Sequence, residues 1–129
     1  MRLTLFLLLS CTSTIGYSQS NGLIGKWKLR RIDADNRTLR PVPEVKEYFL
    51  TISQTSIAYN LDVNDCWGSI VSINDSVLVL SNAGCAQVCC DGRVDAIALY
   101  INYSGRYTIV HDSLLIISND KGKFYLKRE

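Results

Sequence analysis

Short segments in which apolar and polar residues alternate run through most of this 129-residue chain. Residues 26–30 show the pattern most strictly, because Trp27 and Leu29 alternate with three basic residues. Alternation with a period of two is typical of a β-strand that buries one face and exposes the other. The composition agrees, since 47% apolar and 20% charged residues exclude a disordered chain. A mainly β fold with a packed core is therefore expected.

Segments of this kind recur at close spacing, separated by turn-forming residues. We predict strands over residues 26–30, 48–53, 56–63, 67–73, 77–81, 106–110, 114–118 and 123–128. Asn74-Asp75 and Asp112-Ser113 indicate tight turns, whereas residues 31–45, which hold both prolines, are interpreted as a loop. Seven to eight short antiparallel strands joined in this way favour a small antiparallel β-barrel or a curled meander. We expect the first and last strands to pair, which would remove both exposed edges.

The hydrophobic period changes between residues 91 and 103. Apolar residues there fall at i, i+3, i+4 and i+7, namely Val94, Ile97, Ala98 and Ile101. This spacing predicts one short helix before the last three strands, with Asp91 as its N-cap and Gly105 beyond its end. Residues 94–97 also fit a strand. If the helix forms, its apolar face covers the open end of the barrel.

Residues 1–18 have the layout of a secretory signal peptide, with a short positive segment followed by an apolar one. Gly16 and Ser18 are the small residues that precede a cut before Gln19. Residues 19–129 then form a single domain. No stretch reaches the roughly 18 uninterrupted apolar residues of a spanning helix. We therefore expect export to the periplasm or the medium, without a transmembrane segment.

A second processing route competes with this one. Residues 8–11, Leu-Leu-Ser-Cys, resemble a bacterial lipobox, whose cysteine is lipidated and becomes the first residue. In that case Cys11 would anchor the protein to a membrane as a lipoprotein. Both routes lead to a compartment in which disulfides persist.

Four cysteines remain after the leader, an even number in an oxidising compartment: Cys66, Cys85, Cys89 and Cys90. Pairing Cys66 with Cys85 would force the other two, which are neighbours, into a strained ring, so we reject that arrangement. We expect Cys66 to pair with Cys89 or Cys90, and Cys85 to take the remaining one. Such a bridge from Cys66 would pin the predicted helix against the sheet.

The same four cysteines admit a second interpretation, as ligands of a tetrahedral metal ion or as a reactive thiol pair. Their spacing does not match the usual metal-binding cysteine pairs, and the chain holds no C-x-x-C redox motif. We therefore predict structural disulfides, no metal and no other cofactor. A thiol-based metal-binding or redox protein that uses these four residues is the alternative function.

Charge is nearly balanced, with 14 Lys and Arg against 12 Asp and Glu. A nucleic-acid-binding protein would show a strong basic excess, so we exclude nucleic acid as a partner. Closure of the barrel would bring the basic residues of the segment 26–30 near those of the segment 123–128. We interpret this stripe as a solvated strand face that resists aggregation.

Catalysis finds little support in the sequence. His111 is the one histidine, and it stands with Asp112 and Ser113 at a predicted turn. A catalytic triad needs a nucleophile, a base and an orienting acid that converge from separate elements, which three adjacent residues do not provide. Carboxylates spaced for acid–base work and phosphate-binding glycine loops are also absent from the sequence. We therefore predict that the protein is not an enzyme.

Aromatic residues point towards binding instead. Aromatic side chains with polar tips suit ligand sites, and five of them could line the mouth of the barrel. They are Trp67, Tyr59, Tyr100, Tyr103 and Tyr107. Plain core packing is the competing interpretation, because the alternation already predicts it for most of them. The expected partner is an unknown small ligand or an envelope component, and we expect a monomer.

Several short motifs occur in an order that is shared by a known family. The opening is Gly25-Lys26-Trp27-Lys28-Leu29, of the form G-x-W-x-L. Two cysteine elements follow, Asn64-Asp65-Cys66-Trp67-Gly68 and then Cys85 through Cys89-Cys90-Asp91. In this order, and in its closing strands, the chain resembles META-domain proteins and bacterial lipocalin-like domains over nearly all of residues 19–129. The resemblance implies an exported, non-enzymatic, small β-rich domain linked with the bacterial envelope and stress, with no catalytic residue.

Overall fold

The computed structural model of the chain describes residues 22–81, 84–86 and 88–129. Its elements in these ranges are ten β-strands and a short 3-10 helix, η1. The predicted signal peptide, its cut before Gln19 and the alternative lipidation site Cys11 lie outside the described residues. Among the residues that are described, no helix is long and apolar enough to span a membrane.

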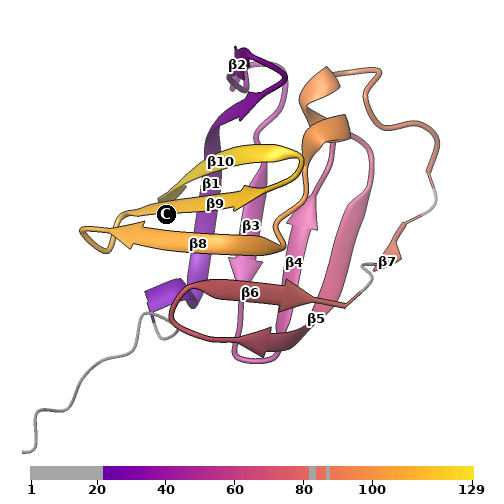
Figure 1. The fold of residues 1–129 in the computed structure, drawn as a ribbon. Helices are drawn as coiled ribbons and strands as arrows, with labels where there is room; N and C mark the ends of the chain where they lie inside the picture. The colour runs from indigo at the N-terminus through magenta and orange to yellow at the C-terminus, as the bar shows by residue number, and fades with distance from the viewer. Residues whose placement is uncertain (1–21, 82–83, 87) are drawn as a thin grey trace, which may run out of the picture.

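Eight strands form a closed antiparallel barrel, in which each strand pairs with the next one of the eight along the chain (Figure 1). They are β1 (Gly25–Ala34), β3 (Phe49–Ile52), β4 (Ser56–Asn60), β5 (Asp65–Ile73), β6 (Val77–Leu80), β8 (Gly105–Val110), β9 (Leu114–Asn119) and β10 (Gly122–Arg128). β10 pairs with β1 and closes the ring. The predicted antiparallel barrel, and its closure by the first and last strands, are confirmed. Two short strands lie outside the ring: β2 (Arg37–Leu39) pairs with β1, and β7 (Gly84–Cys85) pairs with β5.

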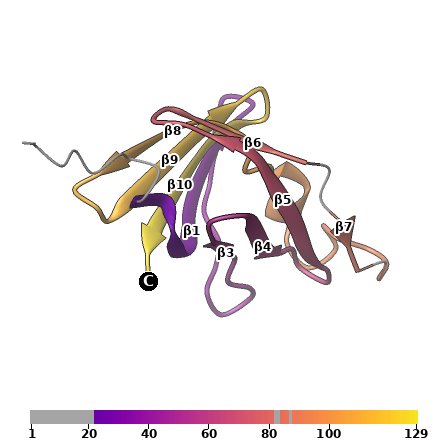
Figure 2. The same cartoon turned by 90° about the horizontal axis from the view of Figure 1, so that it is seen from below.

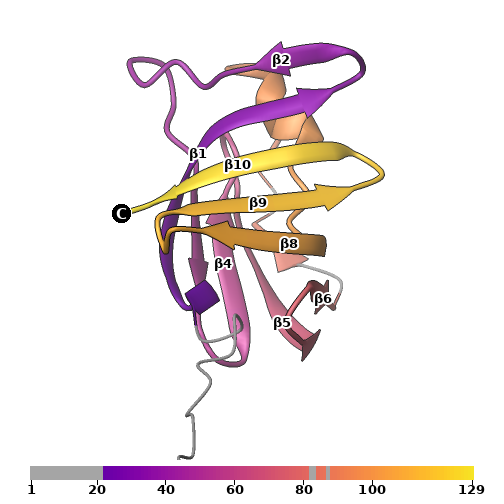
Figure 3. The same ribbon diagram turned by 60° about the vertical axis from the view of Figure 1, so that its left-hand side comes forward.

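β1 is the longest strand, and it carries a bulge at Arg30. One edge of β1 pairs first with β3 and then with β2, while the other edge pairs with β10 (Figure 3). The register with β10 shifts between Leu29 and Arg31. Trp27 and Leu29 are buried before the shift, and Ile32 is buried after it. The extra residue therefore keeps both halves of the strand facing the core.

The region that the sequence suggested was a loop, residues 31–45, contains a hairpin. β1 continues to Ala34, and the chain turns at Asp35-Asn36 into β2. Both turn residues have positive φ, 52° and 59°, which Asp and Asn tolerate better than other side chains. Two such residues form the tight turn that suits a two-residue hairpin. The prediction of a loop over residues 31–45 is therefore wrong for residues 31–39, where Asp35-Asn36 joins two strands in a hairpin.

The helix before the last three strands is present but shorter than predicted. It covers only Ala96–Tyr100, and its N-cap is Asp95, which accepts a hydrogen bond from the backbone N–H of Ile97. The predicted start at Asp91 is wrong because Gly92 has a φ of 90°, outside the right-handed helical region. η1 lies at one end of the barrel, on the side of β2 (Figure 1).

The four apolar residues predicted to share a helix face are not all buried. Ile97 and Ala98 are buried and belong to the core. Ile101 is half-buried and packs against the core, whereas Val94 is exposed. Three of the four predicted residues therefore contact the core, two of them buried, and Val94 takes no part.

Large side chains fill the inside of the barrel. The strands are arranged around this interior (Figure 2). The buried residues of the eight ring strands include Trp27, Leu29, Ile32, Leu50, Ile52, Ile57, Leu78, Tyr107, Leu115, Ile117, Phe124 and Leu126. Tyr103 lies edge-on to Tyr59, with ring centroids 5.4 Å apart, and to Phe124, with centroids 5.8 Å apart. This interior is a packed core, and a binding site in the described part of the chain has to be sought on its surface.

Candidate functional site

A hollow of about 490 Å³ lies on the outer face of β1, β3, β4 and β5. We call it the outer hollow, and it is lined by Lys26, Lys46, Phe49, Thr51, Ala58, Tyr59, Asn60, Asp65, Cys66 and Trp67. The strand register explains its shape. Thr51 lies opposite Lys26 on one side and Ala58 on the other, and Ala58 lies opposite Trp67. Two small outward side chains thus form a floor between larger ones on the neighbouring strands.

Trp67 forms one wall of the outer hollow. Its side chain points outward from β5 and is 57% exposed. Gly84 of β7 is its cross-strand partner, and a Cβ atom on Gly84 would lie 3.3 Å from the indole ring. The missing side chain at Gly84 lets the indole lie close to the β7 backbone. One side of the ring is therefore supported while much of the ring stays open to solvent.

The opposite wall combines an aromatic ring with ammonium groups. Lys26 Nζ lies 4.3 Å from the centroid of the Phe49 ring, a cation–π distance. Lys28 forms an ion pair with Glu47, with 2.7 Å between Nζ and Oε1. Among the described residues, Lys26 and Lys46 have no such carboxylate partner. The hollow therefore offers two ammonium groups to a ligand, against the one carboxylate of Asp65.

Asn60 holds the floor of the outer hollow in place. Its side-chain oxygen accepts a hydrogen bond of 2.7 Å from the backbone N–H of Phe49, and its Nδ2 donates one of 2.8 Å to the carbonyl of Glu47. These bonds occupy both ends of the amide. Asn60 thus positions Phe49 and the Lys46 segment, and the groups left to contact a ligand are the aromatic rings, the lysines, Thr51 and Asp65.

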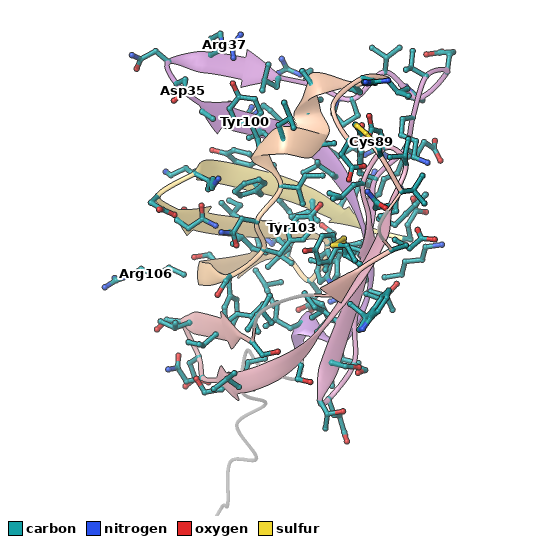
Figure 4. The ribbon with its side chains drawn as sticks, turned by 90° about the vertical axis from the view of Figure 1, so that its right-hand side faces the viewer. Asp35, Arg37, Cys89, Tyr100, Tyr103 and Arg106 are labelled. Carbon is teal, nitrogen blue, oxygen red and sulfur yellow. A yellow bond between two sulfur atoms is a disulfide. The ribbon has the colours of Figure 1, made fainter. Side chains whose placement is uncertain are left out.

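The five aromatic residues predicted to line a barrel mouth do not share one site, although Tyr59 packs on Tyr103 and also borders the outer hollow with Trp67. Tyr107 is buried, and its hydroxyl donates to the carbonyl of Asn74. Tyr100 lies on η1, and its hydroxyl accepts a 2.5 Å hydrogen bond from Arg37 of β2 (Figure 4). Tyr103, only three residues later in the chain, is instead buried in the core. Burial raises the pKa of Tyr107 above its ordinary value. Core packing therefore accounts for Tyr103 and Tyr107.

Tyr59 and Trp67 are the two predicted aromatic residues that border the outer hollow. Tyr59 does so only in part, since its ring packs on Tyr103, and burial raises its pKa. Sequence reasoning missed Lys26, Phe49 and the small residues of the floor. One signal was available: Phe49 falls on the outward side of a predicted strand, where an aromatic residue is unexpected.

His111 occupies the turn between β8 and β9. His111 and Asp112 have φ angles of 52° and 56°, and both side chains are exposed. The prediction that this histidine belongs to a turn is confirmed.

The cysteine pairing differs from the one predicted. The structure joins Cys66 to Cys85 in a disulfide, the arrangement that sequence reasoning rejected. The two residues are direct cross-strand partners in the pairing of β5 with β7. Cys89 and Cys90, which are neighbours in the sequence, are then the remaining two of the four cysteines. The rejection failed because sequence spacing does not reveal that residues 84–85 form a strand beside Cys66. The expectation that Cys66 pins the helix is wrong for the same reason.

Polar side chains of the turn between β4 and β5 hold the segment that leads to η1. The carboxylate of Asp62 accepts hydrogen bonds from the backbone N–H groups of Gly92, at 2.8 Å, and Val94, at 3.0 Å. Asn64 exchanges two 2.9 Å hydrogen bonds with the backbone of Val88. We call Asp62, Asn64 and Asp91 the polar clamp.

Asp91 completes the polar clamp from the other side. Its carboxylate accepts hydrogen bonds from the backbone N–H groups of Val63, at 3.0 Å, and Asn64, at 3.3 Å, and from the side chain of Asn64. Burial on its own would raise the pKa of Asp62, but the hydrogen bonds to its carboxylate lower it to about 2. Among the described residues, no group of three or more His, Cys, Asp or Glu side chains is placed to hold a metal ion.

Comparisons with known proteins bear on the fold alone. No family model and no curated protein matches the chain. A solved structure, an NMR structure of a protein from Burkholderia xenovorans, matches with a TM-score of 0.66 and 14% sequence identity. The match covers 97% of this chain and 99% of that one. At this identity the likeness establishes a shared barrel fold.

The first prediction concerns the disulfide. A bridge between residues 19 positions apart restricts the unfolded chain, which stabilises the fold by about 3 kcal/mol in the chain-entropy model. Cys66→Ala and Cys85→Ala remove the same bridge, so each should lower the free energy of unfolding by about 2–4 kcal/mol. Chemical denaturation of both variants under oxidising conditions measures this loss. A peptide map that links Cys66 to Cys89 or Cys90 would contradict the pairing.

The second prediction concerns acid stability. The pKa of Asp62 lies below its ordinary value of 3.8, so its ionised form stabilises the fold above about pH 4, and this stabilisation is lost as the pH falls towards 2. The shift corresponds to about 2 kcal/mol. Asp62→Asn should lower stability at neutral pH and flatten its decline below about pH 4. The matched control is Asp120→Asn, a substitution in an exposed turn. Denaturation curves recorded between about pH 2 and pH 7 should give this variant the same stability as wild type.

Proposed function

We propose that the protein is an exported, non-enzymatic binding domain, similar to META-domain or lipocalin-like proteins, that binds an envelope component in the outer hollow. The observation that carries the proposal is the exposed indole of Trp67, supported on Gly84 beside a floor of small side chains. A rigid aromatic surface next to a few polar groups is the usual composition of a ligand site. Because side chains fill the interior of the barrel, we place the binding site on the outer face.

The chemistry of the outer hollow favours a ligand with an apolar face and a negative charge. Trp67 and Phe49 offer aromatic surfaces, and Lys26 and Lys46 offer ammonium groups. Thr51 and Asp65 add groups that bond to hydroxyls. An acidic oligosaccharide combines these features, because a sugar ring stacks on an indole while its carboxylate meets a lysine. Acidic glycans of the bacterial envelope are therefore the proposed ligand class.

Export is supported by two independent features of the chain. One is the leader of residues 1–18, with its small residues before Gln19. The other is the disulfide between Cys66 and Cys85, since such bridges persist in oxidising compartments. Both agree with a protein that meets envelope glycans outside the cytoplasm.

The third prediction tests the binding site with soluble muropeptides, which carry sugar rings and carboxylates. The chain has two tryptophans, and Trp27 is fully buried, so a change in fluorescence on titration reports on Trp67. Trp67→Ala should weaken binding measured by calorimetry by about tenfold or more, the usual effect of losing an aromatic anchor. The double variant Lys26→Gln with Lys46→Gln should also weaken binding, and the loss should be larger at low salt than at high salt because salt screens the attraction between charges.

Val71→Ala is the matched control for this test. Val71 lies on the same strand as Trp67, is 65% exposed and does not line the outer hollow. It should bind muropeptides like wild type. Equal affinities for wild type, Trp67→Ala and Val71→Ala, or no binding at all, would exclude the outer hollow as a muropeptide site.

The fourth prediction concerns the exported form. Signal peptidase should cut before Gln19, because Gly16 and Ser18 precede that bond. N-terminal sequencing of the protein recovered from the periplasm or the medium should therefore begin at Gln19. An acylated Cys11 at the N-terminus would show instead that the protein is a membrane-anchored lipoprotein.

A further inference from the structure

Cys89 and Cys90 lie side by side on the loop between β7 and η1. Figure 4 shows Cys89 on this loop, beside η1. The side chain of Cys89 is exposed, and that of Cys90 is half-buried. Because the two residues are consecutive in the sequence, a bond between their sulfur atoms closes a ring that contains a single peptide bond. The pair is thus open to solvent on one side, and neither residue lines the outer hollow.

The polar clamp holds the chain on both sides of this pair. Val88, just before it, exchanges two hydrogen bonds of 2.9 Å with the side chain of Asn64. Asp91, just after it, accepts hydrogen bonds from the backbone of Val63 and Asn64. Only the two cysteines separate these anchors. Non-covalent contacts therefore fix the position of the loop, and a bond between the two sulfur atoms is not needed to keep it there.

The disulfide between Cys66 and Cys85 has the opposite character. Cys66 is 2% exposed and Cys85 is half-buried, and the bridge lies within the pairing of β5 with β7. Opening it would release a restraint on 19 positions of chain, whereas opening a bond between neighbours releases almost none. Access for an attacking thiolate also governs the rate of exchange. A reductant in solution should therefore reach the exposed Cys89 before it reaches the half-buried Cys85 or the buried Cys66.

We propose that Cys89 and Cys90 form a reversible redox pair that exchanges with an external dithiol, while the disulfide between Cys66 and Cys85 is structural. A thiolate of the dithiol attacks Cys89 Sγ, forms a mixed disulfide and releases the Cys90 thiolate, which takes up a proton. The second thiol of the dithiol then attacks its own sulfur in the mixed disulfide and releases Cys89 as a thiol. Two electrons and two protons pass to the pair, and the dithiol becomes a disulfide.

The experiment equilibrates the oxidised mature protein in graded mixtures of reduced and oxidised dithiothreitol, then alkylates the free thiols. Cleavage before aspartate separates Cys66 from the other cysteines at Asp75, and fragmentation by mass spectrometry locates each label. Cys89 and Cys90 should become labelled together, at a reduced-to-oxidised ratio at least about tenfold lower than the ratio that opens the structural bridge. Transfer of the reduced protein, before alkylation, to a mixture rich in oxidised dithiothreitol should restore the oxidised pair, since the oxidised dithiothreitol accepts the two electrons and two protons.

Phenylarsine oxide, a reagent that bridges two neighbouring thiols, gives a second measurement. Wild type reduced at the lower ratio should take up one molecule per chain, and its circular dichroism should not change. Cys89→Ser should take up none, whereas the double variant Cys66→Ala with Cys85→Ala should still take up one. Opening of the Cys66 bridge first, labelling of only one cysteine of the pair, or equal uptake by Cys89→Ser would overturn the proposal. Binding of muropeptides tests a different surface, so the two proposals succeed or fail separately.

Discussion

The pairing of β10 with β1 is the interaction on which the rest of the structure depends. It closes an eight-stranded sheet into a ring, so the apolar sides of all strands meet in one core and neither strand leaves a bare edge. To close the ring, β1 has to present apolar side chains to the core along its ten residues. In a strongly curved strand, strict alternation of inward and outward side chains does not keep the same side facing the core over this length. The bulge at Arg30 solves this by shifting the alternation by one residue between Leu29 and Ile32.

A closed ring of this size also decides where recognition can take place. Eight strands enclose a space that side chains fill, and here Trp27, Tyr103 and Phe124 do so. The outer face is left, and it becomes concave only where small outward residues lie between large ones. Thr51 and Ala58 sit side by side between Lys26 and Trp67, and this placement follows from register. The core and the outer hollow are thus two faces of the same strand pairing.

How much of this is visible in the sequence depends on the range of the interaction. Alternation and turn residues are local, and they predict the strands, the turn at Asn74-Asp75 and the closure of the barrel. The outer hollow depends on which residues of four strands lie opposite one another, so only Trp67 and Tyr59 among its lining were found in advance. The pairing of Cys66 with Cys85 depends on β7, a strand of two residues that leaves no periodic signal.

The short helix shows how a contact distant in the chain overrides a local signal. The apolar spacing of Ile97, Ala98 and Ile101 suits a helix that starts near Asp91. The carboxylate of Asp62, about thirty residues earlier in the chain, instead accepts hydrogen bonds from two backbone N–H groups of the segment before η1. These bonds are strong because one partner is charged, and they hold Gly92 in a non-helical conformation. The loop that results carries Cys89, which is exposed, and Cys90, which is half-buried. A few polar residues in the β4–β5 turn therefore determine both the length of the helix and the exposure of the two neighbouring cysteines.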